Sequence, residues 1–314
     1  MGSEGEANIP VIDFSTEKLK AGTSSWVAAR DSVRRALEEQ GWFIAEYDQI
    51  SLDFHNSIFS VTEEALDLPH ETKMKNFNPK PSFGYMSKIS NIPLHESLGI
   101  DDATVLEACQ NFTKLMWPQG NDRFCECAHL YAQLVAKLEQ IVMRMVFESY
   151  GIEKHYESHV ESSTYLLKLV KYMRPTKEED KVDFVSHSDK TFLTILHQNH
   201  VKGLELRTKD GSWIFFEPSP SSFVVMAGDA CMAWSNERIK PGYHRILVEN
   251  ENEIRYSLAF FSFQKDLIKV PEELVDEEHP LQYKPFDQIS FIRFYVKSGG
   301  KKCKYNVLKA YCGT

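Results

Sequence analysis

The amino-acid sequence predicts an α+β protein in which helices flank a core of short β-strands. Between residues 164 and 264, β-branched and aromatic runs alternate with turn residues, at the spacing typical of a sandwich or jelly roll. Residues 121–150, directly before this region, carry the apolar stripe of one long helix. The sequence shows no repeat of fixed period and no low-complexity linker. We therefore expect residues 1–314 to form a single compact domain.

The first part of the chain, residues 9–120, is predicted to be a mixed region. Residues 9–14 have the composition of a short leading strand. Apolar residues from Trp26 to Leu37 then recur at helical spacing, and Gly41 ends that pattern. Residues 41–45 read as a second, buried strand. This region would place a helix against two strands.

Residues 121–151 are predicted to form a scaffold helix with its cap. Asn121 or Asp122 can cap the beginning of the helix, and Gly151 stops it. The stripe that would face the core consists of Leu130, Leu134, Leu138, Ile141, Met145 and Val146.

The β-rich core is predicted to cover residues 164–264. The expected strands are residues 164–172, 191–197, 203–208, 212–216, 222–226, 244–249 and 254–264. Residues 209–211 (Lys-Asp-Gly) predict a hairpin turn, and Gly228-Asp229 predicts another. Residues 271–314 would then cap the core, with a helix around residues 290–296.

Composition excludes several classes of function. With 36 Lys and Arg against 45 Asp and Glu, the formal charge is −9 and basic clusters are scarce, which argues against nucleic-acid partners. No apolar run is long enough for a membrane span, so we expect no membrane partner. Six cysteines without a secretory signal are expected to be reduced thiols in a cytoplasmic protein. The remaining expectation is a monomer with a small-molecule substrate.

One group of residues combines metal-ligand types with suitable spacing. His187 and Asp189 are two apart, so their side chains would share one face of a strand while Ser188 points away. His244 supplies a further imidazole. Two imidazoles and one carboxylate leave part of an octahedral ion open, as in non-haem Fe(II) oxygenases. A chance His-x-Asp on the surface is the alternative for the tripeptide alone.

Arg255 and Ser257 are predicted to face the same cavity. If residues 250–253 form a turn with an even number of residues, strand pairing places both side chains on the face of His244. A buried arginine requires an anion, and its planar fork suits a carboxylate. The alternative partner is an acidic residue of the protein itself.

Taken together, these motifs resemble those of the plant-type Fe(II)/2-oxoglutarate-dependent dioxygenases. Residues 9–13 (Ile-Pro-Val-Ile-Asp) are similar to the N-terminal opening of that branch, and residues 41–43 (Gly-Trp-Phe) to its second landmark. His187-x-Asp189, His244 and Arg255-x-Ser257 resemble its catalytic core. Residues 191–198 and 272–280 resemble most the subgroup that oxidises glucosinolate side chains and steroidal glycoalkaloids.

The resemblance implies a fold, cofactors and a reaction. The core would be a distorted double-stranded β-helix, that is, a jelly roll, with Fe(II) on His187, Asp189 and His244. The far carboxylate of 2-oxoglutarate would bind Arg255 and Ser257. Oxidation of a small hydrophobic specialised metabolite, by hydroxylation first of all, would convert 2-oxoglutarate and O2 to succinate and CO2. Ascorbate is a candidate reductant.

The sequence departs from the family pattern where the family has Asn-Tyr-Tyr-Pro. Residues 171–175 read Lys-Tyr-Met-Arg-Pro, so the tyrosine that commonly contacts 2-oxoglutarate is expected to be replaced by Met173.

Aromatic residues are expected to form the substrate pocket, with ordinary core packing as the alternative for each. By the same pairing rule, Phe261 and Phe263 would continue the face of Arg255 and Ser257. Phe83, Tyr85, Phe291 and Phe294 are expected to cover the mouth of the pocket.

The other histidines lack ligand-type spacing. His197 and His200 are interpreted as a surface pair, with a contact to the substrate as the alternative. The rest are expected to be exposed or locally hydrogen-bonded, and they are His55, His70, His95, His129, His155, His159 and His279.

Three other functions remain open on the sequence. The same iron chemistry can end in desaturation, epoxidation, ring closure or demethylation, and the ligands do not distinguish these outcomes. A jelly roll can also serve as a non-catalytic receptor for small molecules. Zinc could occupy the ligands, although a site with open positions is not a structural zinc cage.

Overall fold

The computed structural model describes residues 9–89, 92–173, 186–247, 253–300 and 306–314. Its strands are β1 (Val11–Asp13), β2 (Trp42–Glu46), β3 (Met86–Ile89), β4 (Ile92–Asp101), β5 (Ser163–Tyr172), β6 (Leu193–Gln198), β7 (Leu204–Arg207), β8 (Trp213–Phe215), β9 (Ser222–Ala227), β10 (His244–Ile246) and β11 (Arg255–Gln264). Its α-helices are α1 (Ser24–Glu39), α2 (Leu52–Leu66), α3 (His70–Lys73), α4 (Leu106–Met116), α5 (Asp122–Ser149), α6 (Tyr156–Ser162), α7 (Asp229–Trp234), α8 (Gln288–Lys297) and α9 (Val307–Cys312). Among the described residues, none of these helices combines the length and apolar character needed to cross a bilayer.

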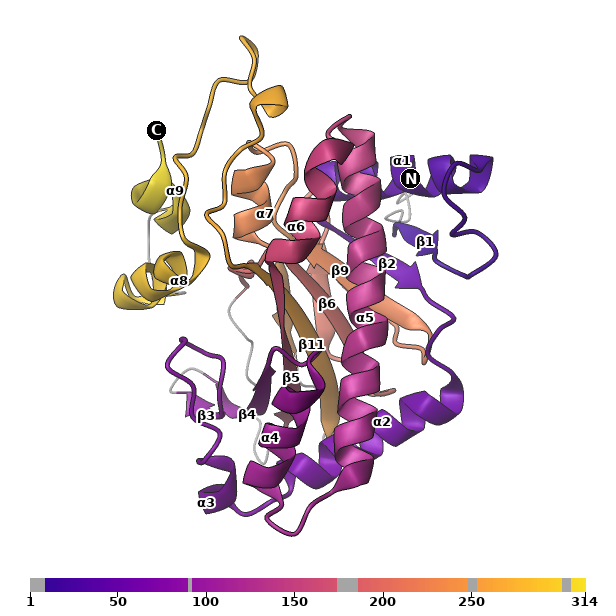
Figure 1. Cartoon of the computed structure of the whole chain (residues 1–314), viewed down its shortest axis with the longest axis vertical. Helices are drawn as coiled ribbons and strands as arrows, with labels where there is room; N and C mark the ends of the chain where they lie inside the picture. Colours follow the sequence, from indigo (N-terminus) through magenta and orange to yellow (C-terminus); the bar gives the residue numbers. More distant parts are fainter. Residues whose placement is uncertain (1–8, 90–91, 174–185, 248–252, 301–305) are drawn as a thin grey trace, which may run out of the picture.

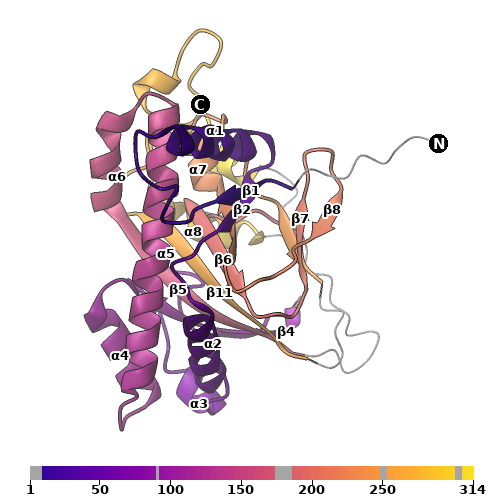
Figure 2. The ribbon, with the colours of Figure 1, turned by 90° about the vertical axis from the view of Figure 1, so that its right-hand side faces the viewer.

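The strands form two sheets of unequal size. The major sheet has eight strands in the order β1-β2-β9-β6-β11-β5-β4-β3, and the minor sheet has three in the order β10-β7-β8. All pairs are antiparallel except β1 with β2. Helices cover one face of the major sheet, and β7 and β8 lie on the other side (Figure 2). This arrangement confirms the predicted α+β jelly-roll class.

The long helix α5 crosses the strands of the major sheet and supports them (Figure 1). As the sequence predicts, Asn121 caps the helix, since its side chain accepts a hydrogen bond from the Phe124 amide at 3.0 Å. Gly151 follows the helix with φ +68°, a conformation that favours glycine. The buried face of α5 carries Val135 and Leu138, which point at the sheet.

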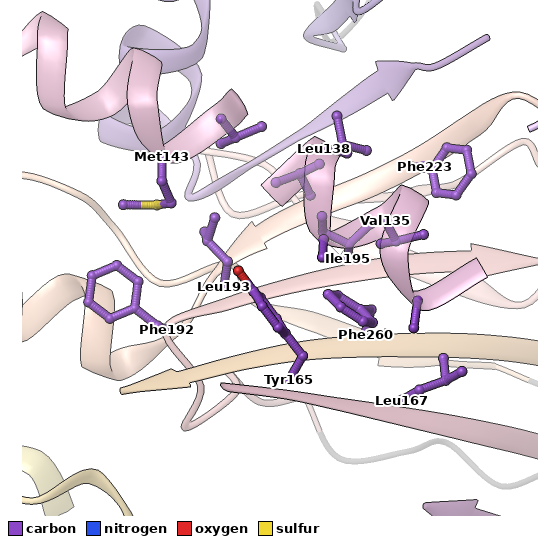
Figure 3. Close-up of a cluster of buried hydrophobic side chains, with 14 of the residues drawn as sticks. Val135, Leu138, Met143, Tyr165, Leu167, Phe192, Leu193, Ile195, Phe223 and Phe260 are labelled. Atoms are coloured by element: carbon purple, nitrogen blue, oxygen red, sulfur yellow. The ribbon is translucent and has the colours of Figure 1, made fainter. Parts of the chain in front are cut away.

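Every second side chain of each central strand packs into the core between α5 and the sheet. Figure 3 shows Tyr165 and Leu167 of β5, Leu193 and Ile195 of β6, Phe223 of β9 and Phe260 of β11 facing Val135, Leu138 and Met143 of the helix. The alternate residues of the same strands point to the opposite face. That face packs partly against the minor sheet, through a second apolar cluster that includes Val224, Met226 and Leu206.

Two local predictions are wrong. Gly228-Asp229 is not a hairpin turn, because Asp229 begins helix α7 directly after β9. The strand expected at residues 244–249 is the three-residue β10, which pairs with β7 and not with β11. The predicted turn between them falls largely at residues 250–252, outside the described residues. The prediction that His244 and Arg255 share a face assumed that their two strands pair with each other, and β10 and β11 do not.

Three histidines are buried, namely His197, which was expected in a surface pair, and His55 and His159, which were expected to be exposed or locally hydrogen-bonded. His197 is fully buried, and its Nε2 lies 3.0 Å from Nδ1 of His55, itself 8% exposed. His159 packs among the rings of Phe147, Phe192 and Trp234, and its Nε2 has no hydrogen-bond partner in the described chain. The positions of the histidines in the sequence could not show that these polar rings fill the interface between the helices and the sheet.

Burial of His159 predicts a dependence of stability on pH. Desolvation lowers the pKa of His159 to about 3, so the unfolded chain takes up this proton first, near its ordinary pKa of about 6.5. Stability is therefore lost as pH falls below that value, by about 1.4 kcal/mol per pH unit for one such histidine. His159→Leu should reduce the loss of unfolding free energy between pH 6.5 and pH 5, measured by urea denaturation. An unchanged pH dependence in the variant would contradict this explanation.

Candidate iron and 2-oxoglutarate site

The two predicted histidine ligands lie next to each other because their backbones pair. His187 and His244 form an isolated antiparallel bridge, with N–H···O distances of 3.1 and 3.0 Å in the two directions. Their ring centroids are 4.3 Å apart. Residue 187 belongs to the segment before β6, and residue 244 begins β10 of the minor sheet. The bridge therefore brings together two distant parts of the sequence.

Asp189 completes a group whose ligand atoms all lie within 4.8 Å of one another. Its Oδ1 lies 3.7 Å from Nε2 of His187. The other oxygen, Oδ2, accepts a hydrogen bond from the Thr194 hydroxyl at 2.7 Å. Ser188 turns its own hydroxyl to Asp229 at 2.6 Å, as expected for the residue between two ligands. One carboxylate oxygen is thus oriented by a hydrogen bond, and the other lies on the side of the histidine.

The donor set fits a ferrous ion. Two neutral imidazoles and one carboxylate are ligands that iron accepts, and together they occupy one face of an octahedron. Nδ1 of His244 lies 3.3 Å from the Gly242 carbonyl oxygen, which leaves Nε2 to bind the metal. The side chains of His187 and Asp189 are 18% and 17% exposed, so the site is partly open to the cavity.

Arg255 lies deep in the same cavity and has unused donors. Its guanidinium is 1% exposed, stands over the Tyr172 ring at 4.6 Å and donates from Nη2 to Gln198 Oε1 at 2.6 Å. Within the described chain, Nε and Nη1 have no hydrogen-bond partner. A Cβ on Gly203 would come within 3.0 Å of Arg255 Cδ, so glycine permits this close packing. A buried guanidinium with two unpartnered nitrogen donors fits the far carboxylate of 2-oxoglutarate.

Tyr172 is the aromatic residue beside this anion site, and not Met173. Tyr172 pairs with Arg255 across β5 and β11, lines the cavity, and burial raises the pKa of its hydroxyl, opposed by the neighbouring guanidinium. Met173 is absent from the cavity wall. The sequence prediction concerned position 173, whereas the residue of this stretch that lies opposite Arg255 and lines the cavity is Tyr172, one position earlier. Strand alternation from Leu166 would have shown which of the two faces inward.

The cavity has a volume of about 650 Å³ and holds all five predicted ligand residues. Its floor follows the inward residues of β11, which are Arg255, Ser257, Ala259, Phe261 and Phe263. Phe83 also lines the wall and packs on Phe263 with ring centroids 4.8 Å apart. One end of the cavity is thus polar and the other is aromatic.

Three residues expected at the mouth of the cavity lie elsewhere. Tyr85 contacts His70 and the carboxylate of Glu96. Phe291 is fully buried, and both Phe291 and Phe294 pack on Tyr311. The face of α8 that lines the cavity carries Ile292, Tyr295 and Val296 instead. Aromatic content alone did not reveal which face of this helix turns inward.

Comparison with known proteins agrees with this geometry. The model of the 2OG-Fe(II) oxygenase superfamily matches residues 164–264, and that of the non-haem dioxygenase in morphine synthesis N-terminal region matches residues 9–101. A probable 2-oxoglutarate-dependent dioxygenase, AOP1.2 of Arabidopsis thaliana, is 42% identical over 93% of this chain and 92% of its own length. The chain belongs to the 2OG-Fe(II) oxygenase superfamily.

Two solved structures show the same fold in the same superfamily. The dioxygenase for auxin oxidation from rice matches 98% of this chain and 100% of its own, with a TM-score of 0.80 and 26% identity. Its Arabidopsis thaliana counterpart, in a complex with 2-oxoglutarate, covers 87% and 99%, with a TM-score of 0.77 and 26% identity. This chain is accordingly a 2-oxoglutarate-dependent dioxygenase that uses Fe(II) and O2, which confirms the family, the enzyme class and the cofactors expected from the sequence.

The hydrogen bond from Thr194 to Asp189 predicts a measurable effect on metal affinity. Thr194→Val removes the hydroxyl at nearly constant volume, so Asp189 loses the donor that orients it. We expect Fe(II) or Mn(II) affinity to fall about 10- to 100-fold, measured by calorimetry on metal-free protein. Thr62→Val is the matched control, because Thr62 is buried on α2 and its hydroxyl has no partner in the described chain. Equal metal affinity in wild type and Thr194→Val would reject the role of this hydrogen bond.

The two free donors of Arg255 predict a selective loss of cosubstrate binding. Arg255→Ala should raise the 2-oxoglutarate KM by about 10-fold or more, since hydrogen bonds to a charged group contribute about 1.5–3 kcal/mol. Metal affinity should change little. Arg207→Ala, at an exposed position of β7, serves as the control. An unaltered cosubstrate KM in Arg255→Ala would mean that another residue holds the keto acid.

Proposed function

We propose that this dioxygenase hydroxylates a small hydrophobic specialised metabolite, using His187, Asp189 and His244 as iron ligands and Arg255 with Ser257 as the 2-oxoglutarate anchor. The observation that carries the proposal is the position of all five residues around one cavity, with two unpartnered donors on the buried arginine. When bound, Fe(II) and 2-oxoglutarate supply the activation of O2, and the keto acid becomes succinate and CO2.

The protein would contribute position and the exclusion of water. The backbone bridge holds the two imidazoles side by side, and the Thr194 hydroxyl orients the Asp189 carboxylate near them. The Arg255 guanidinium would orient the keto acid from the far end, so that its other end reaches the metal. The substrate carbon held nearest the metal would then be the one that reacts. No proton transfer from a protein acid is required in this scheme.

The size and lining of the cavity support a small, largely apolar substrate. A volume of about 650 Å³ lies within the range of pockets for metabolite-sized ligands. Beyond the polar end, the walls are formed by Leu166, Phe261, Phe263 and Ile292. The solved relatives named for auxin oxidation also act on a small molecule. Of the six aromatic residues first expected to line this wall, Phe83, Phe261 and Phe263 remain in the proposal.

The division of labour along the chain follows from this assignment. We propose that residues 164–264 carry the chemistry, because they contain every metal and 2-oxoglutarate ligand. Residues 9–120 and 271–314 would complete the substrate pocket, since Phe83 and Met86 precede the core and Tyr295 follows it. Residues 121–151 would act only as the supporting helix.

We also propose that the enzyme works as a cytoplasmic monomer. The five cysteines in the described chain, Cys109, Cys125, Cys127, Cys231 and Cys312, are free thiols, which suits a reducing compartment. Light scattering on the purified protein tests the monomer, and microscopy of a tagged chain tests the compartment.

The decisive assay follows succinate and the substrate together. Wild-type protein should convert 2-oxoglutarate to succinate only with Fe(II) present, and the product should gain one oxygen atom. Desaturation or ring closure would instead remove two hydrogen atoms, and demethylation would release formaldehyde. A non-catalytic receptor would bind metabolites without forming succinate, which would refute the proposed function.

Single replacements of His187, Asp189 or His244 by Ala should abolish succinate formation and weaken Fe(II) binding. Each variant removes one of the three protein side chains that are proposed to bind the ion. His200→Ala is the control, because His200 has an exposed side chain that pairs with Glu253 at the surface. Undiminished turnover in any one of the three variants would remove that residue from the proposed ligand set.

A further inference from the structure

Lys168 is a buried lysine in the middle of the cavity floor. On β5, Leu166, Lys168, Val170 and Tyr172 alternate with core residues and face the cavity. Lys168 is 7% exposed. It pairs across the sheet with Ala259, which also lines the cavity.

No acidic group of the described chain neutralises this lysine. Its one hydrogen-bond partner there is the thioether sulfur of Met86, at 3.2 Å, and a thioether is only a weak acceptor. The other lysine of the cavity, Lys190, already pairs with Asp229 at 2.7 Å. Burial lowers the pKa of Lys168 to about 7, with no opposing contribution from a carboxylate. Keeping such a group in an apolar wall costs stability unless a ligand repays it.

We propose that Lys168 binds a monoanionic group of the substrate, a carboxylate or a sulfate-like group, so that the metabolite oxidised by this enzyme is an acid. This inference rests on the function proposed above and narrows its substrate class. A single ammonium offers three donors and one positive charge, which matches one monoanion. It provides too little charge for a phosphate dianion.

The position of Lys168 separates it from the cosubstrate anchor. In the register of β5 and β11, Arg255 lies opposite Tyr172 and Ser257 opposite Val170, whereas Lys168 lies opposite Ala259. Lys168 is therefore about 7 Å along the strand from the level of Ser257, and about 13 Å from that of Arg255. Its next inward neighbours, Leu166 and Phe261, are apolar. Two anions can thus occupy the cavity at once, one on each cation.

An acid held at Lys168 would also explain how the cavity selects its substrate. The apolar body of the metabolite would lie between Phe261, Phe263 and Ile292, and the salt bridge would fix its direction. A neutral analogue of the same shape would leave the lysine without a partner. Sites built around such a polar contact reject ligands that lack it more strongly than apolar walls reject a change of size.

Calorimetry on the protein loaded with Mn(II) and 2-oxoglutarate tests the inference. The probes are phenylalkyl carboxylates of increasing chain length, with the matching sulfonates and the matching carboxamides. The wild type should bind an anion about 10-fold or more tightly than its carboxamide, as expected for a hydrogen bond to a charged group. Lys168→Met should lose this preference and bind the carboxamides as before. The stronger anion series identifies which acid the site prefers.

Proton uptake provides a second readout that a merely structural lysine would not change. At about pH 8, most of the Lys168 amines are neutral, and a bound anion favours the protonated form. Titrations in buffers of different ionisation enthalpy should show uptake of nearly one proton per anion in the wild type. Lys168→Met should show none, and Lys202→Met, an exposed lysine paired with Glu217, should behave as the wild type.

Separate results overturn the inference and the proposed function. The inference fails if no anion of the series binds, if carboxamides bind equally well, or if Lys168→Met keeps the preference for anions. It also fails if Lys168→Met chiefly weakens 2-oxoglutarate binding, because Lys168 would then belong to the cosubstrate site. The proposed function fails instead if the Fe(II)-loaded wild type forms no succinate while the anion preference is present.

Discussion

The backbone bridge between His187 and His244 is the constraint on which the site depends. The two histidines come from segments far apart in the sequence, and their paired N–H and C=O groups hold the two residues side by side. The bridge also joins the beginning of β10, in the minor sheet, to the segment that leads into β6 of the major sheet. A further backbone contact positions Asp189, because its carbonyl oxygen accepts a hydrogen bond from the Asp229 amide at 2.8 Å. The same backbone contact between His187 and His244 therefore links the two sheets and brings the proposed histidine ligands together.

The central strands serve two functions through their alternation. One face of β5 and β11 carries Tyr165, Leu167 and Phe260, which pack under α5, while the other carries Arg255, Ser257 and Lys168. Burying Arg255 and Lys168 on the opposite face costs stability, and the anionic ligands proposed above would offset that cost. Buried charges without a protein partner lower stability, and proteins usually keep such groups only at functional sites.

Local patterns predicted the parts of this protein that local chemistry determines. The spacing of His187 and Asp189, the cap of Asn121 and the β-rich texture of residues 164–264 are visible in short windows of sequence, and the strands and the long helix follow from them. Long-range pairing is not visible in this way. The expectation that β10 and β11 form a hairpin was wrong because nothing in residues 244–257 shows that β10 joins another sheet. His244 and Arg255 nevertheless share the cavity, for a different geometric reason.

The remaining errors concern which face of an element turns inward. Phe291 and Phe294 lie on the side of α8 away from the cavity, and Tyr172 rather than Met173 faces Arg255. Each error is a shift of one residue, which reverses the face of a strand and rotates a position on a helix by about 100°. Lys168 was missed because a lysine in a strand usually reaches solvent, and only the sheet register shows that it cannot.

The most direct test of the whole account is a crystal structure of the protein with Mn(II) and 2-oxoglutarate, with the metal located by its anomalous signal. We predict one metal about 2 Å from the ligand atoms of His187, Asp189 and His244, with the far carboxylate of the keto acid on Arg255 and Ser257. Metal bound elsewhere, or a keto acid whose far end lies on Lys168, would contradict this prediction.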